Sequence, residues 1–425
     1  MIVAAIIGLL IISLVAGVPV GFALLLSGVA GLAWIGGLPM VLGILETTPA
    51  ASVSSYELIT IPMFILMAEL MIVSGVADDL FDTLGRWMER LPGGLAIATA
   101  LSGAAFGAVS GSSTAAAATL SASSVPTMIR RGYDPAFASG VVAISGTLAM
   151  LIPPSIALIL YGLLSGANIG ALLVAGVIPG ILVTLVIVGT VLFLVWRNPT
   201  LAPRGTGDGQ ATGNVWSGLS FLGLFLAVTG VIYTGIATPT EASALGAFGA
   251  LCIAVVKGKL DWRTSRLALY KAARSTAMIA MIIIGAQVFG YFLTLTQVPQ
   301  EIVASAGQIG APRWAILLVI LFIYLILGCF LDQIAILILT VPVVLPLVLQ
   351  LGYDPIWFGV LVIVMAEIGL VTPPVGINVF VVSRYTGVPM ERVFIGVTPH
   401  VIAHFVAIAL LIIFPSLVLW LPSTM

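Results

Sequence analysis

Oxygen-bearing side chains inside apolar stretches are the residues of this sequence best suited to chemistry. A run of hydroxyl groups lies at a turn from Ser110 to Thr114, and a second group precedes Pro153-Pro154. Such oxygens can coordinate a cation or bind a substrate oxygen, although close helix packing also selects small residues and explains Ala115 to Ser124. The cation-site candidates here are Ser110, Ser112, Ser113, Thr114, Ser145, Gly146, Thr147 and Pro153, and Ser112 and Ser113 are also candidates to face a substrate.

Two acidic residues occupy the corresponding places in the second half of the chain, where Asp332 matches Ser112 and Glu367 matches Thr147. A charge at the bilayer centre costs about 2.5 to 3.5 kcal/mol on insertion scales, so acids there are functional candidates by default. Asp332 can cap a helix, form a cation site, or do both. Glu367 can couple proton movement or form a structural hydrogen bond. Further cation-site candidates are Asp332, Glu367 and Pro373, and further substrate-facing candidates are Asp332, Gln333 and Asn378.

The remaining polar residues of the apolar stretches have simpler explanations. His400 and His404 lie four positions apart, but two histidines are a weak metal signal, and we predict no transition-metal site. Glu69 is interpreted as structural. The segment Thr238 to Glu241 has the pattern of a helix start, with a threonine cap, a proline at the first position and a glutamate at the third position after the cap.

Motifs of several enzyme classes are missing from the sequence. It contains no G-x-x-x-x-G-K-[ST] loop, no G-x-S-x-G elbow and no H-E-x-x-H pair. We therefore expect no enzyme activity and no ATP hydrolysis by the P-loop route. Energy for moving a solute would have to come from an ion gradient, and no cofactor other than a coupling ion is expected.

Composition places these residues in a membrane. Of the 425 residues, 61% are hydrophobic and only 7% are charged, and the mean hydropathy is +1.26. Soluble domains carry about 25% charged residues, so most of this surface must face membrane lipid. The net charge of −1 gives no reason to expect nucleic acid as a partner. The apolar start from Met1 to Pro19 lacks a cleavage pattern and a preceding basic residue, so we expect it to be retained.

An internal repeat organises the chain. Gly132-Tyr133-Asp134-Pro135 recurs as Gly352-Tyr353-Asp354-Pro355, and Pro153-Pro154 recurs at the same shift as Pro373-Pro374. The same shift, from Gly132 to Gly352, relates three further pairs of prolines, namely Pro19 and Pro239, Pro92 and Pro312, and Pro126 and Pro346. Together these matches indicate a duplicated fold. Between the copies lies the hydrophilic, glycine-rich stretch from Arg197 to Asn214, which we interpret as a linker.

Basic residues predict that the two copies have opposite orientations. Cytoplasmic flanks of membrane segments are enriched in Lys and Arg, and 14 of the 15 basic residues can be placed inside, with Arg313 left outside. This assignment requires external loops at Gly37 to Leu58, Ser165 to Gly170 and Pro299 to Pro312. Arg130-Arg131 then precede the first GYDP on the inside, while the second follows uncharged residues on the outside. The result is an inverted repeat.

Each copy is predicted to contain a re-entrant hairpin and a broken helix. The apolar arms beside each tip are about 15 residues long, shorter than the roughly 20 needed to span a bilayer, and two consecutive prolines must end a helix. We expect an all-α integral membrane protein in which residues 1–196 form the first repeat (hairpin 93–128, broken helix 135–165), residues 197–216 a cytoplasmic linker, and residues 217–425 the second repeat (hairpin 313–349, broken helix 355–385).

Interrupted helices at membrane depth are tolerated where they line a cavity or are buried in protein. Half-helix C-terminal ends and unwound carbonyls suit Na⁺, whereas half-helix N-terminal ends suit anions. A single Pro-Pro break is more often a simple kink. Two symmetric breaks, each beside a polar hairpin tip, favour a site for a cation and a solute.

These segments together resemble the large membrane subunit, DctM type, of tripartite ATP-independent periplasmic (TRAP) transporters. The resemblance covers nearly the whole chain and rests on the following segments: IPMFILMAELM from Ile61, GAVSGSS from Gly107, RRGYDPAFASG from Arg130, GTLAMLIPPSIALILYG from Gly146, ATPTEASALGAFGAL from Ala237 and EIGLVTPPVGINVFV from Glu367. It implies a Na⁺-coupled secondary transporter that works as an elevator. It also implies one Na⁺ at Ser110 to Thr114 with Ser145 to Thr147, and another at Asp332 with Gly369 and Thr372.

The resemblance also implies partners and a location. The expected partners are a small four-helix membrane subunit (DctQ type), here a separate polypeptide, and a periplasmic solute-binding protein (DctP type). We expect a multi-pass protein of the bacterial inner membrane with both termini in the periplasm. The expected substrate is a small organic anion such as a C4-dicarboxylate. A stand-alone anion transporter of similar fold, and a channel, remain alternatives at this point.

Overall fold

The protein is all helical in the part of the chain that the structure describes. The computed structural model describes all residues except 1, 89, 204–214, 299, 302–303 and 305–309. Eight of the described segments are long and apolar enough to cross a membrane. The helices before residue 204 are α1 (Ile2–Val15), α2 (Val20–Val53), η1 (Tyr56–Ile59), α3 (Thr60–Val73), α4 (Val76–Met88), α5 (Gly94–Ser110), α6 (Ser113–Arg130), α7 (Pro135–Thr147), η2 (Leu148–Met150), α8 (Ile156–Ser165), α9 (Ile169–Ala175), α10 (Val177–Arg197) and η3 (Pro199–Leu201).

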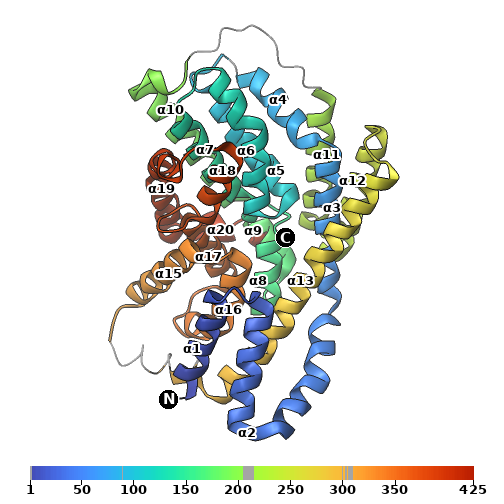
Figure 1. The fold of residues 1–425 in the computed structure, drawn as a ribbon, viewed down its shortest axis with the longest axis vertical. Coiled ribbons are helices and arrows are strands. Elements are labelled where there is room, and N and C mark those ends of the chain that lie inside the picture. Colours follow the sequence, from blue (N-terminus) through green and yellow to red (C-terminus); the bar gives the residue numbers. More distant parts are fainter. Residues whose placement is uncertain (1, 89, 204–214, 299, 302–303, 305–309) are drawn as a thin grey trace.

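Most of the predicted linker, residues 197–216, lies outside the described residues, and its described part contains the end of α10, η3 and the start of the next helix. The second group of helices follows from residue 215. They are α11 (Val215–Tyr233), α12 (Pro239–Val256), α13 (Trp262–Leu295), α15 (Arg313–Phe330), α16 (Gln333–Gln350), α17 (Pro355–Gly369), α18 (Ile377–Thr386), α19 (Met390–Ile413), α20 (Ser416–Leu419) and η4 (Pro422–Thr424). The starts of α6 and α16, and those of α7 and α17, are separated by the same shift as the two GYDP segments. In Figure 1 the hairpin α5–α6 lies in the upper part of the molecule and the hairpin α15–α16 in the lower part.

Both hairpin tips are two-residue turns whose sequence stops one helix and caps the next. Gly111 ends α5 with a φ of +55°, a conformation that favours glycine, and the Ser112 Oγ then accepts a hydrogen bond from the Ala115 N–H (3.4 Å). At the second tip Leu331 and Asp332 are extended, and the Asp332 carboxylate accepts from the Ile334 N–H (3.2 Å). Asp332 is therefore a helix cap, as one of its two predicted roles required.

The two broken helices are interrupted at the predicted Pro-Pro pairs. The first interruption, which we call break 1, runs from Leu151 to Ser155 between η2 and α8, and break 2 runs from Leu370 to Gly376 between α17 and α18. The peptide bond within each proline pair is cis. Proline supplies no N–H and disfavours helical geometry in the residue before it, which explains both interruptions.

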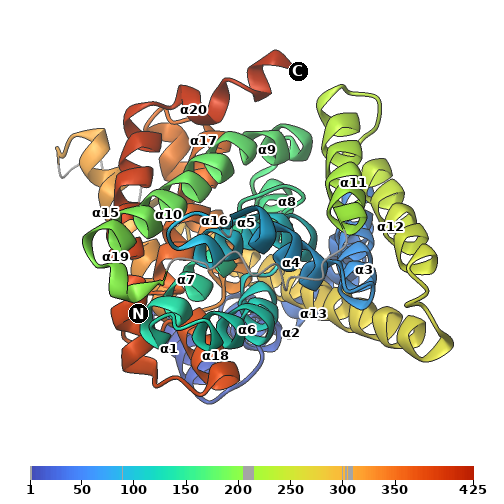
Figure 2. The same ribbon diagram turned by 90° about the horizontal axis from the view of Figure 1, so that it is seen from above.

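The two halves do not pack as separate blocks, because helices of the first half pack directly against helices of the second half. Helix α2 packs along α13 and α3 along α12, while α6 contacts α18 and α8 contacts α16. Small residues allow these approaches: at Gly21 an added Cβ would lie 2.9 Å from the Met281 carbonyl oxygen. Figure 2 shows α3, α11 and α12 gathered on one side of the molecule and α7, α10 and α19 on the other. We call α2, α3, α12 and α13 the scaffold pairs, and the two hairpins with the two broken helices the core.

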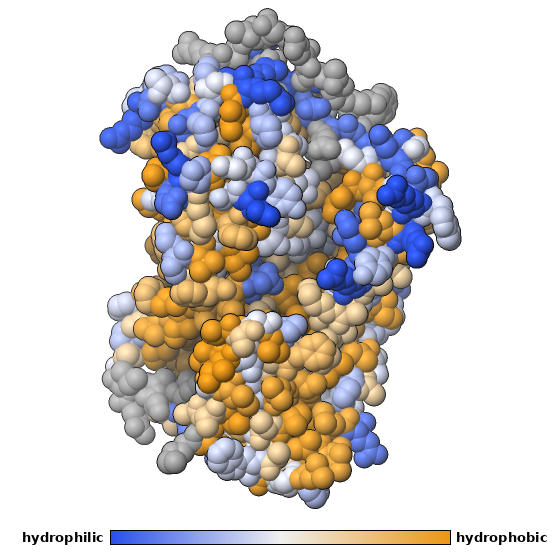
Figure 3. Space-filling view, viewed as in Figure 1, coloured by the Kyte–Doolittle hydropathy of each residue, from blue (hydrophilic) through white to orange (hydrophobic). Residues whose placement is uncertain are grey.

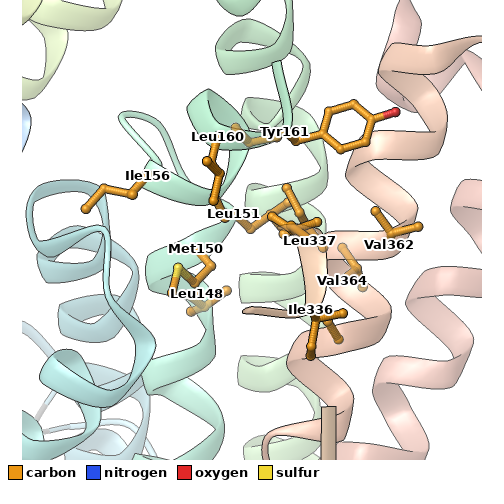
Figure 4. Close-up of a cluster of buried hydrophobic side chains, with 14 of the residues drawn as sticks. Leu148, Met150, Leu151, Ile156, Leu160, Tyr161, Ile336, Leu337, Val362 and Val364 are labelled. Carbon is orange, nitrogen blue, oxygen red and sulfur yellow. The ribbon is translucent and has the colours of Figure 1, made fainter. Parts of the chain in front are cut away.

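The apolar centre of the core joins break 1 to the second half. Figure 4 shows Leu151 and Tyr161 of the first broken helix beside Leu337 of α16 and Val362 of α17. All four are fully buried, and the Tyr161 hydroxyl donates to the Pro355 carbonyl oxygen (2.7 Å). The contact fixes α8 against the start of α17.

One predicted loop is wrong. The segment Gly37 to Leu58 was expected to be an external loop, but α2 resumes after a sharp bend at Gly37 (φ 66°, ψ −170°) and continues to Val53. The apolar residues beyond Gly37 satisfy their backbone as helix, and only the bend needs glycine. Figure 3 shows hydrophilic residues gathered at the upper end, around the ends of α4, α6 and α10, and apolar residues over the lower part.

Candidate cation and solute site

The first hairpin tip is bonded to the opposite half of the protein. Ser113, the first residue of α6, is buried, and its Oγ accepts a hydrogen bond from the Asn378 Nδ2 of α18 (2.6 Å). The same amide nitrogen lies 3.4 Å from the Ala143 carbonyl oxygen of α7. The structure thus brings together Ser113 and Asn378, which the sequence placed in different halves. Asn378 Oδ1 is buried and has no hydrogen-bond partner.

The other hydroxyls of the first tip bond locally. Ser110 is buried, and its Oγ donates to the Ser112 carbonyl oxygen (3.5 Å). The Ser112 and Thr114 hydroxyl oxygens lie 3.3 Å apart. A hydroxyl that uses one lone pair keeps another for a cation, so these bonds leave oxygen ligands at the turn.

The end of α7 contributes two hydroxyls and a close helix contact. Ser145 Oγ donates to the Val141 carbonyl oxygen (2.6 Å) and Thr147 Oγ1 to that of Ile144 (2.7 Å), and both residues are fully buried. Gly146 faces α6, where an added Cβ would lie 2.9 Å from the Ala117 Cβ. Gly146 therefore has a packing role whether or not its backbone holds an ion.

Break 1 is buried, and Ser155 organises it. The Ser155 hydroxyl donates to the Met150 carbonyl oxygen, and its oxygen accepts from the Leu158 N–H (3.2 Å), so one side chain caps α8 and satisfies the end of η2. Pro153 and Pro154 are buried beside it. Sequence reasoning did not select Ser155 as a site residue, although a serine immediately before an apolar run is a recognisable cap signal.

The second tip contains a cap, a buried amide and, on the neighbouring helix, a buried acid. Gln333 Nε2 donates to the Ile363 carbonyl oxygen of α17 (3.3 Å), and its Oε1 has no partner. Gln333 therefore lies inward against α17 and is fully buried. Glu367, one helical turn after Ile363, is also fully buried, and neither carboxyl oxygen has a hydrogen-bond partner.

Break 2 is more open than break 1. Pro373 and Pro374 are exposed, and Val375 is 39% exposed. Thr372 Oγ1 donates to the Ile368 carbonyl oxygen (2.6 Å). Gly369 packs against α15, where an added Cβ would lie 2.5 Å from the Gly328 Cα. Gly369 and Thr372, the two cation-site candidates that the family resemblance implied, thus lie at or just past the end of α17, shortly after Glu367 in the chain.

Residues interpreted as structural have structural contacts. Glu69 lies 3.7 Å from the Lys271 Nζ of α13, and Thr238 and Glu241 form a capping box. His400 and His404 are buried on α19, and among the described residues no group of three or more potential ligands could hold a metal ion.

A cavity of about 580 Å³ lies between the scaffold pairs and the core. Its walls include η1 and the starts of α3 and α12 on one side, and the turn between α8 and α9 on the other. Thr60 and Thr240 both line it, and their hydroxyl oxygens lie 2.9 Å apart. A smaller cavity of about 230 Å³ shares Leu164 and Gln287 with it and reaches Pro342 of the second hairpin.

Comparisons with known proteins agree with this architecture. The family described as "Tripartite ATP-independent periplasmic transporter, DctM component" matches residues 7–417. The C4-dicarboxylate TRAP transporter large permease protein DctM of Pseudomonas aeruginosa is 36% identical over 372 residues, covering 87% of this chain and 86% of that protein. The sialic acid TRAP transporter large permease protein SiaM of Vibrio cholerae is 31% identical over 412 residues, covering 96% of each.

A solved structure shows the same fold. The YdaH transporter of Alcanivorax borkumensis superposes with a TM-score of 0.67 at 14% identity, covering 93% of this chain and 96% of that one. At that identity the likeness speaks for the fold alone. The family match and the relatives decide the assignment, and this chain belongs to the DctM family of large permease subunits of TRAP transporters.

Proposed function

We propose that this chain is the permease of a Na⁺-coupled secondary transporter that takes up a small organic anion. Membership of the DctM family supports transport. The observation that carries the Na⁺ assignment is the set of neutral, buried oxygens at the first tip and the end of α7, which includes Ser110, Ser113, Ser145 and Thr147. Neutral hydroxyls and helix-terminal carbonyls suit a monovalent cation.

We assign one Na⁺ to each half. The first would use the tip Ser110 to Thr114 with Ser145 to Thr147, close to Pro153. The second would use Asp332 with Gly369 and Thr372, next to Pro373, with Glu367 just before them on α17. Both assignments place the ion at the C-terminal end of a half-helix, where the helix dipole is negative.

The substrate is proposed to be a carboxylate held without a basic side chain. In the described core helices Lys and Arg occur only near helix ends, at Arg130, Arg313 and Arg384. The anion would therefore be held by hydroxyls, by the N-terminal ends of α6 and α16, and by the bound Na⁺. Ser112, Ser113, Asp332, Gln333 and Asn378 are the proposed substrate-facing residues. The two relatives named above carry C4-dicarboxylate and sialic acid in their names, both of which are carboxylates.

Movement is proposed to follow an elevator scheme in which the core slides past the scaffold pairs. The 580 Å³ cavity lies along this boundary, and an unfilled volume there supports a boundary at which the two parts can move. A small four-helix membrane subunit would brace the scaffold, and a periplasmic binding protein would deliver the anion. These partners are those of the family, and the inner membrane of a bacterium is the expected location.

Reconstitution tests the proposal. The chain is placed in liposomes with its small subunit and binding protein, and uptake of labelled C4-dicarboxylates and sialic acid is measured with and without an inward Na⁺ gradient at constant ionic strength. Uptake should require the Na⁺ gradient, and undiminished uptake in K⁺ would overturn the Na⁺ assignment. Uptake without the binding protein would favour the stand-alone alternative, and transport that neither saturates nor shows counterflow would favour a channel.

A further inference from the structure

The two hairpins are held at equivalent residues by different partners. Ser113 and Gln333 occupy the same place in the two repeats, and each is the buried first residue of the second hairpin arm. Gln333 bonds to α17 of its own half, whereas Ser113 is bonded by Asn378 from the other half of the chain. Ser113 is therefore hydrogen-bonded across the repeat, whereas the hydrogen bond of the Gln333 side chain in the described structure stays within its own half.

Asn378 also holds break 2. It is the second residue of α18. Its backbone N–H donates to the carbonyl oxygen of Leu370 (3.0 Å), which is the first residue after α17. Its side chain reaches Ser113 on α6 and Ala143 on α7. One residue thus links break 2, the first tip and the helix that carries Ser145.

The hydrogen bond from Asn378 is accepted by the Ser113 hydroxyl oxygen, which has few acceptor positions. A serine hydroxyl has two lone pairs and one proton. The Asn378 amide occupies one lone pair of Ser113 Oγ and so orients the other. The fully buried Asn378 side chain forms its hydrogen bonds through its nitrogen, because its Oδ1 has no hydrogen-bond partner. Together with the backbone bond to Leu370, this bond connects the position of Ser113 to that of break 2.

We propose that Asn378 is a positioning residue that couples the cation site of the first half to break 2 of the second half. This inference rests on the proposed function, because it assumes that a cation binds at the first tip. Binding there would hold Ser113, and through Asn378 would fix the position of break 2 relative to α6 and α7. The Asn378 side chain acts through the Ser113 oxygen and need not touch the ion.

Na⁺-dependent stabilisation of the purified protein tests this without a substrate or partners. Melting temperature is measured against Na⁺ concentration, with choline keeping the ionic strength constant, for the wild type, Asn378→Ala, Ser113→Ala and the double variant. Each single change should raise the half-saturating Na⁺ concentration about tenfold, the size typical when a residue that orients a ligand is lost. The double variant should have a half-saturating Na⁺ concentration no higher than that of the more strongly affected single variant, because both changes break the same hydrogen bond.

Controls separate the possible failures. Asn198→Ala makes the same chemical change at an exposed cap after α10 and should leave the Na⁺ response unchanged. If Asn378→Ala does not melt cooperatively, Asn378→Leu is close in size, carries neither a hydrogen-bond donor nor a charge, and should still raise the half-saturating Na⁺ concentration. Additive losses in the double variant, or a normal Na⁺ response in Asn378→Ala, overturn the inference alone. A wild type without a Na⁺-specific shift overturns the Na⁺ assignment and the inference with it.

Discussion

The two hairpin tips occupy equivalent places in the fold, yet their chemistry differs, and so does the exposure of the breaks beside them. The first tip consists of hydroxyls, is bonded to the opposite half and adjoins the buried break 1. The second tip is capped by an acid, is bonded to its own half and adjoins the exposed break 2. The inverted halves therefore share a backbone plan but offer two kinds of oxygen group, one beside a buried break and one beside an exposed break.

The largest expected effect is at Asp332. Asp332→Ala should reduce uptake by about 100-fold while leaving membrane insertion intact, because it removes both a helix cap and the carboxylate of the proposed second site. Ser112→Ala at the equivalent position removes a cap worth about 1 kcal/mol and one of several hydroxyls, so its effect should be smaller. Uptake by reconstituted protein measures both, with membrane levels checked by immunoblot. Equal losses would contradict the difference between the tips.

The contact between hairpin and broken helix offers a second comparison. Gly369→Ala should strongly destabilise the second half, since the new Cβ would lie 2.5 Å from the Gly328 Cα and 2.6 Å from the Leu325 carbonyl oxygen. The matching position in the first half is Ala149, which already carries a methyl group, so Ala149→Gly should cost only about 1 kcal/mol from chain flexibility. Thermal unfolding in detergent compares them, and a tolerated Gly369→Ala would show that α15 and α17 can separate.

Labelling tests the difference in access to the two breaks. Ser155 and Val375 occupy equivalent positions in the two repeats, and they are 0% and 39% exposed. In a background with Cys252 and Cys329 replaced, Val375→Cys should react with a water-soluble maleimide about tenfold faster than Ser155→Cys, because local opening must precede reaction at the buried site. Similar rates would mean that both breaks open equally.

The smallest expected effect concerns the two GYDP turns. The Tyr133 hydroxyl oxygen accepts a hydrogen bond from the Leu95 N–H at the start of α5 (3.2 Å), whereas the Tyr353 ring is approached by the Arg313 guanidinium, 5.7 Å from its centroid. Tyr133→Phe should cost about 1 kcal/mol of stability by leaving that N–H without its acceptor, while Tyr353→Phe keeps the ring and should be nearly neutral. Chemical denaturation in detergent measures the free energy of unfolding of both variants. A larger loss of stability for Tyr353→Phe would show that the hydroxyl of Tyr353, not that of Tyr133, is the more important one.

Local sequence rules predicted the parts of the fold that depend on local backbone chemistry. Paired prolines located both breaks, and polar turns between apolar stretches located both hairpins. The predicted arm length of about 15 residues was too short, because the arms are 17 or 18 residues long and those of the second hairpin are long enough to cross a membrane. The capping box at Thr238 and the cap at Asp332 follow from residue type and spacing. The bend at Gly37 was missed because a glycine within an apolar run does not reveal whether its φ is positive.

Contacts between distant segments could not be obtained in this way. Nothing in the neighbourhood of Ser113 or Asn378 indicates that they meet, since their bond depends on how α18 packs on α6. Gln333 follows an acid at a polar tip and so suggested a substrate contact. The sequence did not indicate that its Nε2 donates to the Ile363 carbonyl oxygen, which leaves only its Oε1 without a hydrogen-bond partner. The ligands of the proposed Na⁺ sites and the substrate-facing set stay predictions.

The packing of helices between the halves bears on how such a chain could arise and be made. Because α2 packs on α13 and α6 on α18, the faces of the first half that become buried stay uncovered until the second half has been synthesised and inserted. An ancestor of half this length would have had to bury the same faces between two oppositely inserted copies. On that view the bond between Ser113 and Asn378 descends from a subunit contact, and gene fusion made it possible for the two partners to differ.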